Sequence, residues 1–278
     1  MVLFELWLWP LLALVLLPGL LVYFGLHVVE RGVIFVDLAL AQIAALGVCF
    51  AIAFDPHPGH HPHTYLLSLA FTLVGAALFS WTRFRHPRVP QEAIIGIIYV
   101  VAAAAATLVL SRTAQGDEAM KDLLLGNILL VGRDEVIRVC ALYAPIALFH
   151  YLLRGRFLVN SFREADARRR GVAVRRWDFL FYATFGLVVV SFVQIAGVYL
   201  VFSYLIVPAV CGALLAVRIR PRLVIGWTVA LLAGIAGLLL SVQLHRLDLP
   251  TGPTIVCVFG VLLLLSAAVA AIRQRAGN

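Results

Sequence analysis

The sequence predicts an all-α protein, a polytopic transmembrane bundle of about eight or nine helices. Apolar residues fill 63% of the 278 positions, charged residues only 13%, and the mean hydropathy is +1.01. A soluble domain of this length exposes too much surface to water to tolerate that composition. The apolar runs are continuous and do not alternate with polar residues, which favours membrane helices over a barrel.

A membrane span needs about 20 residues of helix. The predicted spans are, in chain order, 4–26, 33–54, 64–82, 92–112, 134–153, 178–217, 223–243 and 253–272. The first contains Glu5 instead of a basic flank and lacks an obvious small-residue cleavage site, so we predict a span and not a signal peptide. Together the spans form a single transmembrane domain over residues 1–278 in the lipid bilayer.

The later spans are bounded by loops of distinct composition. The second and third are separated by the histidine-rich stretch 55–63, and the third and fourth by the basic loop 83–88. The fifth ends at the arginine-rich segment 154–177. The last two lie between the basic turn 218–222 and the basic tail 273–275.

The sixth run, 178–217, is twice the usual length and has arginines at both ends. If both ends are cytoplasmic, the run must cross the membrane and return. We therefore predict two segments that meet near Gln194–Gly197. We also consider a break around Pro208, which would leave a shorter half-helix.

The basic residues set the orientation. Of the 22, 17 fall on one face, at Arg31 and in the clusters 83–88, 154–177, 218–222 and 273–275. Because lysine and arginine collect on the cytoplasmic side, we predict an external N-terminus and a cytoplasmic C-terminus in the inner (plasma) membrane. The net charge of +8 then reflects topology, and we expect no nucleic-acid partner.

Motifs for catalysis are missing from the sequence. It has no GxxxxGK[ST], so it cannot bind ATP through a P-loop of its own. It also has no HExxH and no GxSxG. We therefore predict a transport subunit and not an enzyme, with no intrinsic cofactor.

Three stretches carry a family resemblance: Phe35-Val-Asp-Leu-Ala-Leu-Ala-Gln-Ile-Ala-Ala-Leu-Gly47, Leu123-Leu-Leu-Gly-Asn-Ile-Leu129 and Phe162-Arg-Glu-Ala-Asp-Ala-Arg-Arg-Arg-Gly171. The third is followed by an apolar run that contains Gln194, Gly197, Ser203 and Pro208. In order and spacing, these stretches resemble the metal-type ABC permease family, which imports zinc, manganese or iron.

The resemblance implies the permease subunit of an ATP-driven ABC importer for a divalent metal ion, working as a homodimer. It implies two further partners, a cytoplasmic P-loop ATPase subunit that binds the ATP and an extracytoplasmic metal-binding protein. The binding protein would dock on the outer face at the acidic residues Asp117, Glu118, Asp134 and Glu135. The alternatives are a metal exporter and a secondary transporter driven by an ion gradient.

By the resemblance, the segment 154–177 couples the permease to the ATPase. Phe162, Ala167 and Gly171 match the family's F-x-x-x-x-A-x-x-x-G element, and Arg163 lies within it. The residues alone also allow a charged loop that is held at the anionic leaflet.

We predict that Asp37, Gln42 and Gln194 lie on the translocation path, Asp37 because an ionisable group within a span usually faces a partner or a wet cavity. The family's second span has Asp and His four residues apart, whereas the aligned positions here are Leu38 and Gln42. Asp37 and Gln42 point about 140° apart on a regular helix, so they cannot chelate one ion together. Asp37 can instead pair with Arg31 or cap its helix, and Gln42 can form a hydrogen bond between helices.

The stretch 55–63 holds four of the chain's eight histidines, His57, His60, His61 and His63. Neutral imidazoles bind borderline divalent metals such as zinc. The prolines and Gly59 exclude a helix, so any metal would bind loosely. The stretch is either a site of metal capture on the outer face or an ordinary polar loop.

Overall fold

The computed structural model describes residues 2–54, 62–83, 89–111, 121, 124–126, 128–162, 166, 169, 173–243 and 249–276. Within these ranges the chain is helical and contains no strand, which confirms the all-α prediction. The elements are α1 (Val2–Arg31), α2 (Val36–Phe54), α3 (Pro62–Trp81), α4 (Gln91–Leu110), the 3-10 helix η1 (Ile128–Leu130), α6 (Arg133–Leu152), α7 (Arg154–Phe162), α9 (Val174–Leu215), α10 (Ile219–Gln243) and α11 (Thr251–Ala276).

Among the described residues, eight helices are long and apolar enough to cross a membrane. Each of the eight predicted spans corresponds to one of them. The largest difference is at α1, which was expected to end at 26 and continues to Arg31. The added turn carries Arg31 on the helix, and its side chain lies in a buried ion cluster.

The long helix α9 has one irregular residue, Gly197, whose φ of 75° and ψ of 167° are not helical. Only glycine adopts this region at little energetic cost. The predicted junction near Gln194–Gly197 is therefore confirmed. The break considered around Pro208 is wrong, because the helix continues through that residue to Leu215. A buried proline is tolerated in a membrane helix when neighbouring helices pack against the backbone it disturbs, and Gly226 of α10 packs against the Pro208 carbonyl.

The chain forms two compact units. The first unit comprises Met1–Val29, Leu125–Tyr143 and Ile195–Asn278, and the second comprises Glu30–Leu124 and Ala144–Gln194. Three helices, α1, α6 and α9, contribute one part to each unit. The predicted single domain with a coupling segment at 154–177 stays a prediction.

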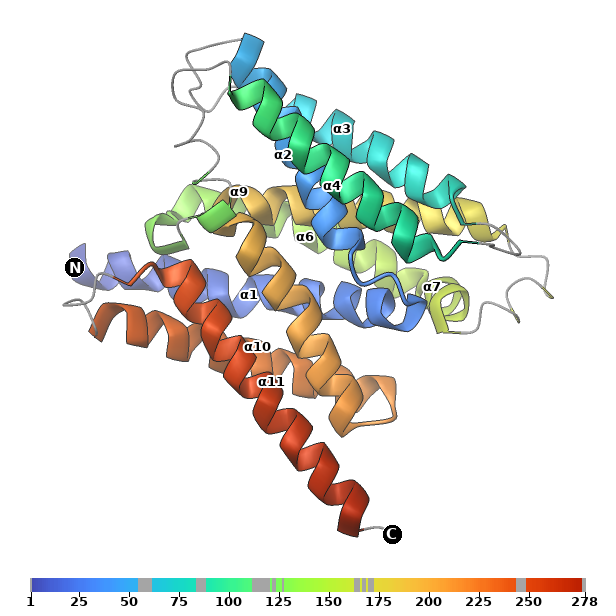
Figure 1. The fold of residues 1–278 in the computed structure, drawn as a ribbon. Coiled ribbons are helices and arrows are strands. Elements are labelled where there is room, and N and C mark those ends of the chain that lie inside the picture. The colour runs from blue at the N-terminus through green and yellow to red at the C-terminus, as the bar shows by residue number, and fades with distance from the viewer. Residues whose placement is uncertain are drawn as a thin grey trace. The chain divides into compact units, whose positions relative to one another are not determined.

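Small residues bring the helices of the first unit together. A Cβ on Gly25 of α1 would collide with the Leu205 carbonyl of α9, and a Cβ on Gly237 of α10 would lie 2.6 Å from the Ile255 Cα of α11. Figure 1 shows α10 and α11 in contact along part of their lengths. Such close approach is typical of helices that pack without a hydrophobic driving force between them.

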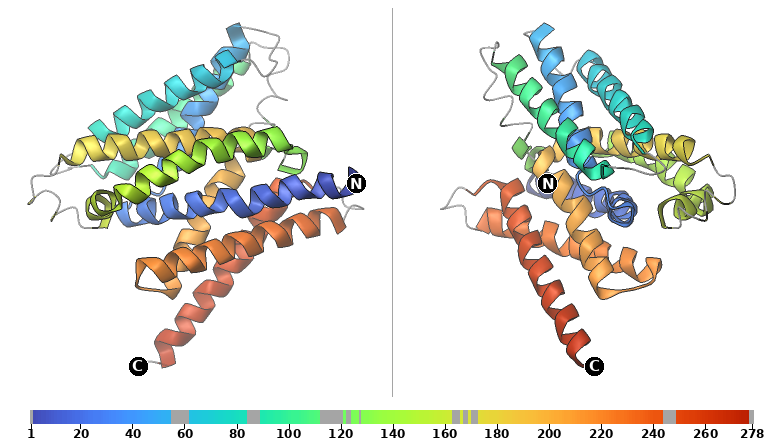
Figure 2. Two further views of the ribbon diagram at one scale, coloured as in Figure 1. Left: turned by 180° about the vertical axis from the view of Figure 1, so that it is seen from behind. Right: turned by 45° about the vertical axis from the view of Figure 1, so that its right-hand side comes forward.

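In the second unit, α2 lies between α3 and α4, as both Figure 1 and Figure 2 show. Gly47 of α2 permits a close backbone contact, because a Cβ there would lie 2.8 Å from the Ser68 Cα of α3. The Ser68 hydroxyl donates a hydrogen bond to the Ala44 carbonyl at 3.0 Å. Asp37 and Gln42 are buried on this central helix.

Candidate functional site

The break in α9 meets the second of the three motif stretches. Gly126 has a φ of 58°, and a Cβ there would collide with the backbone of Ala196 and Gly197. On its other side, a Cβ on Gly252 of α11 would lie 2.8 Å from the Leu125 carbonyl. Irregular backbone in a membrane protein is tolerated where it is buried in protein or lines a cavity. The stretch around Gly126 therefore supports the broken helix from within the first unit.

Two of the predicted path residues lie on α2 in the second unit. The Asp37 side chain is in the first turn, where the helix dipole favours a carboxylate. It is 1% exposed, and neither carboxylate oxygen has a hydrogen-bond partner among the described residues. Gln42 is 6% exposed. No hydrogen bond within the described part of the chain joins Asp37, Gln42 and Gln194, and Gln194 is exposed three residues before the break.

A carboxylate near Asp37 comes from α4. Glu92 accepts a hydrogen bond from the Phe35 backbone N–H at 3.0 Å, immediately before α2 begins. Both acidic side chains therefore lie at the start of α2. The expected pairing of Asp37 with Arg31 is wrong, because Arg31 pairs with a different carboxylate.

That carboxylate is Asp178 of α9, the centre of a buried polar cluster. Its Oδ1 accepts from Arg31 Nη1 at 2.9 Å and from Arg83 Nη1 at 2.5 Å. It also accepts from Asn160 Nδ2 at 2.8 Å, while Arg31 Nε donates to Ser161 Oγ at 2.8 Å. The Asp178 side chain is fully buried and that of Arg31 is 1% exposed. We call these five residues the Asp178 cluster.

The Asp178 cluster contains two cations and one anion, so it buries a net positive charge. Aromatic rings offset part of it, because the Arg31 guanidinium carbon lies 3.8 Å from the centre of the Phe181 ring and 5.5 Å from that of Tyr182. The cluster ties together four segments: the end of α1, the residues after α3, the helix α7 and the start of α9.

The helix α7 is held by one face. Phe157, Asn160 and Ser161 are buried and recur at helical spacing, while Arg154 and Arg156 are exposed. Phe157 stacks on His150 of α6, with ring centres 4.1 Å apart. The predicted coupling segment therefore begins with a helix that is anchored in the second unit.

Most of the predicted coupling residues fall elsewhere. Phe162 is the last residue of α7 and is half-buried, whereas Arg163, Ala167 and Gly171 lie outside the described residues. Whether they contact an ATPase subunit stays a prediction.

The predicted metal-capture stretch is also mostly outside the described residues, which include His63 but not His57, His60 or His61. His63 is exposed in the first turn of α3. Within the described ranges, no three His, Cys, Asp or Glu side chains come close enough together to hold a metal ion. The role of this stretch stays a prediction.

The predicted acidic docking residues divide in the same way. Asp134 is exposed in the first turn of α6. Glu135 accepts a hydrogen bond from the Gly132 backbone N–H at 2.9 Å and so caps that helix. Asp117 and Glu118 lie outside the described residues.

The Asp178 cluster was not anticipated as a unit. From the sequence, its arginines belong to the positive-inside pattern and Arg31 is a candidate partner of Asp37, but Asp178, the acid that begins the sixth run, has no predicted role. The sequence did contain a signal for this cluster, because an ionisable group such as Asp178 at the start of an apolar span needs a partner. Asn160 and Ser161 carry no comparable sign in the sequence.

The sequence profile of the ABC 3 transport family matches residues 4–270. This chain belongs to the ABC 3 transport family. As an ABC 3 permease it is a multi-pass membrane protein and a transport subunit, and ATP hydrolysis belongs to a separate subunit.

Named relatives of this ABC 3 permease include two transport proteins. It is 24% identical over 242 residues to the manganese transport system membrane protein MntC of Halalkalibacterium halodurans, covering 87% of this chain and 80% of the relative. It is 26% identical over 173 residues to the chelated iron transport system membrane protein YfeD of Yersinia pestis, covering 62% of this chain and 57% of the relative.

Its fold is similar to that of PsaBC from Streptococcus pneumoniae, solved in complex with Fab. The TM-score is 0.77 and the sequence identity 21%, with 95% of this chain and 91% of that chain covered. At this identity the likeness concerns the fold alone.

Proposed function

We propose that this chain is the permease subunit of an ATP-driven importer for a divalent metal ion, with manganese and iron as the first candidates and zinc as the third. Membership of the ABC 3 family supports the class of transporter. Relatives named for manganese and for chelated iron transport support the cargo. The observation that carries the coupling step is the Asp178 cluster.

In this proposal the N-terminus is outside and the C-terminus cytoplasmic, in the inner membrane. The ATPase subunit binds the segment 154–177, which includes the anchored helix α7. Asn160 of α7 donates a hydrogen bond to Asp178. Because separating a buried ion pair is strongly unfavourable, a displacement of α7 that moves Asp178 is passed on to Arg31 and Arg83. Two copies of the permease and two ATPase subunits then open the path alternately to the two sides.

The cargo passes Asp37, Gln42 and Gln194. The buried, unpartnered carboxylate of Asp37 supports this assignment, since an ionisable group within a span usually faces a partner or a wet cavity. On the outer side, His57, His60, His61 and His63 capture metal, and a binding protein docks near Asp117, Glu118 and Asp134. Glu135 is occupied in capping its own helix.

The experiment is uptake of radioactive manganese into proteoliposomes that contain the permease, its ATPase subunit and ATP. We expect Asp37→Asn to lose most of the uptake while the protein remains inserted, and Asp37→Glu to keep a measurable part of it because the carboxylate is retained. Uptake by Asp37→Asn at the wild-type rate would remove Asp37 from the path. Uptake that needs an ion gradient but no ATPase subunit would favour the secondary transporter, and net efflux would favour the exporter.

The coupling step has a separate test. Reversing the charges of Arg168–Arg170 is expected to abolish ATP-driven uptake and to weaken copurification of the ATPase subunit. Reversing Arg273 and Arg275, which lie on the same proposed face, is the matched control and is expected to leave both unchanged. Equal loss in the two variants would contradict a specific coupling role for 154–177.

A further inference from the structure

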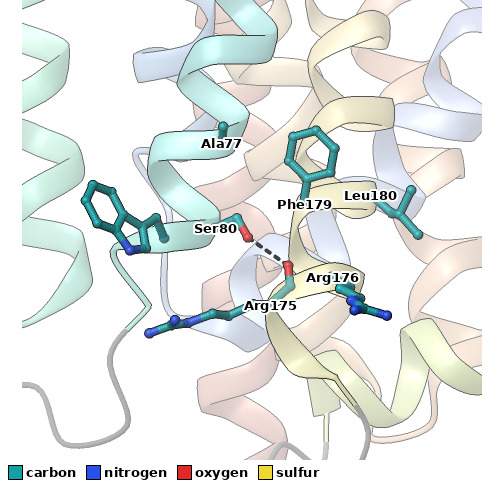
Figure 3. A pocket seen from close by; sticks show the side chains of 7 residues that line it. Ala77, Ser80, Arg175, Arg176, Phe179 and Leu180 are labelled. Atoms are coloured by element: carbon teal, nitrogen blue, oxygen red, sulfur yellow. Dashed lines mark hydrogen bonds between the residues drawn. The ribbon is translucent and has the colours of Figure 1, made fainter.

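A groove lies between the end of α3 and the start of α9 in the second unit, with a volume of about 510 Å³. Ala77 and Trp81 line it from α3, and Phe179 and Leu180 line it from α9. Figure 3 shows Ala77, Phe179 and Leu180 on one side of the groove and the side chains of Arg175 and Arg176 on the other. The groove therefore has an apolar end and a cationic end.

A hydrogen bond fixes the floor of the groove. The buried Ser80 hydroxyl donates to the Arg175 backbone carbonyl at 2.7 Å and joins the two helices. Figure 3 shows this bond between the apolar side chains and the arginines. Because the Ser80 hydroxyl is already used, the wall above it offers only apolar surface to a ligand.

The two arginines are available to a ligand. Both are exposed, and within the described part of the chain neither guanidinium forms an ion pair, a hydrogen bond or a cation–π contact. The contrast with Arg31 and Arg83 is direct, since those two share the carboxylate of Asp178. An unpaired cation beside a membrane favours a negatively charged group.

The aromatic residue at the rim indicates where the groove lies across the thickness of the membrane. Trp81 is 68% exposed at the last residue of α3, and tryptophan is enriched where the acyl region of a bilayer meets the headgroups. The apolar wall then faces acyl chains while the arginines face headgroups. A small soluble anion would gain nothing from the apolar wall, whereas a phospholipid uses both ends.

We propose that this groove binds an anionic phospholipid of the cytoplasmic leaflet, with its phosphate at Arg175 and Arg176 and an acyl chain along Ala77, Phe179 and Leu180. The leaflet rests on the orientation in the proposed function, whereas the site itself does not depend on transport. The lipid would occupy the lipid-facing side of the same helix start that holds Asp178.

Native mass spectrometry of the purified full-length chain tests the proposal, with phosphatidylglycerol and phosphatidylcholine of identical acyl chains titrated in turn. We expect the wild type to retain phosphatidylglycerol in preference. Replacing one arginine, as in Arg176→Gln, should weaken this retention about fivefold, since each basic side chain near an anionic surface contributes roughly that factor. Arg175→Gln with Arg176→Gln should weaken it on the order of twentyfold.

Two further variants distinguish binding in the groove from non-specific attraction of anionic lipid to surface arginines. The pair Arg218→Gln and Arg220→Gln removes two exposed arginines from the same proposed face and should leave lipid retention unchanged. Ala77→Phe keeps both charges but fills the apolar end, and it should reduce retention of phosphatidylglycerol. Retention must also persist in the assembled transporter, where a second copy of the chain could otherwise cover the groove.

Equal retention of the two lipids by the wild type would overturn the proposal. So would equal losses in the site pair and the control pair, no effect of Ala77→Phe, or loss of the lipid on assembly of the dimer. None of these measurements uses ATP or metal, so a failure here leaves the transport proposal standing, and a failure of transport leaves the lipid site standing.

Discussion

The two units of this permease differ in the contacts between their helices. In the first, Gly25 and Gly237 bring backbones into contact, so the packing depends on volume. In the second, the side chains of Arg31 and Asp178 are buried and that of Arg83 is 10% exposed, and both arginines form ion pairs with Asp178. We call the first kind of packing volume-limited, because an added methyl group should disrupt it, and the second charge-limited, because loss of a charge should disrupt it. The two kinds respond to different substitutions, so the comparison can be tested directly.

The difference also assigns mechanical roles. In the first unit, small-residue packing fixes the distances between helices, and the buried Ser241–Thr251 hydroxyl pair adds a neutral hydrogen bond between α10 and α11. The Asp178 cluster has specific donors and acceptors from four segments, and one of those segments is α7. The unit that carries the start of the proposed coupling segment is therefore the one with this buried, charged network.

The largest expected loss of stability follows from removing the negative charge of Asp178. Asp178→Asn keeps the shape and one acceptor but leaves two buried arginines without an anion, which should destabilise the protein by about 3–5 kcal/mol. Thermal unfolding in detergent is the measurement. The control Asp134→Asn removes an exposed carboxylate and should change stability by less than about 0.5 kcal/mol. Similar small changes in both variants would contradict a charge-limited second unit.

A smaller effect is expected at the break in α9. Gly126→Ala forces a side chain into a left-handed conformation and into the backbone of Ala196 and Gly197, at a combined cost of about 2–4 kcal/mol. The same unfolding assay measures it. Gly96→Ala, in α4 with no neighbouring atom within 4 Å of its Cβ, should be neutral or slightly stabilising. Equal stability of the two variants would show that the stretch around Gly126 does not support the irregular residue Gly197 of α9.

The volume-limited packing of the first unit has a matched pair on one helix. Gly25→Ala should cost about 1–3 kcal/mol, because the new Cβ meets the Leu205 carbonyl. Gly19→Ala places its Cβ in open space and should raise stability by about 0.5–1 kcal/mol. If Gly25→Ala is tolerated as well as Gly19→Ala, the helices of this unit are not in close contact there.

The smallest effect tests a neutral polar contact in the second unit. His150 Nε2 lies 2.8 Å from Thr184 Oγ1. Thr184→Val keeps the side-chain volume and removes this bond, which should cost about 0.5–1.5 kcal/mol. A loss as large as that of Asp178→Asn would mean that neutral hydrogen bonds, and not charge, limit the stability of this unit.

Sequence reasoning reached the spans because twenty-residue apolar runs and arginine-rich flanks are local properties. It predicted a junction near Gln194–Gly197 because the run was too long for one crossing, and the structure places the irregular residue at Gly197. The further break that it considered around Pro208 is wrong, and the packing of Gly226 against that carbonyl, between residues 18 positions apart, is not visible in the sequence. It offered the nearby Arg31 as one possible partner of Asp37, whereas the fold pairs Arg31 with Asp178, 147 positions away.

Composition and periodicity by themselves determined that this chain crosses a membrane as helices, because a backbone in hydrocarbon must satisfy its own hydrogen bonds. The order of its motifs indicated the family. Only the tertiary structure decided which charges neutralise each other and which arginines remain exposed. The physical reason is that ion pairing acts over a few ångströms in space, and sequence separation places no limit on which side chains the folded helices bring that close.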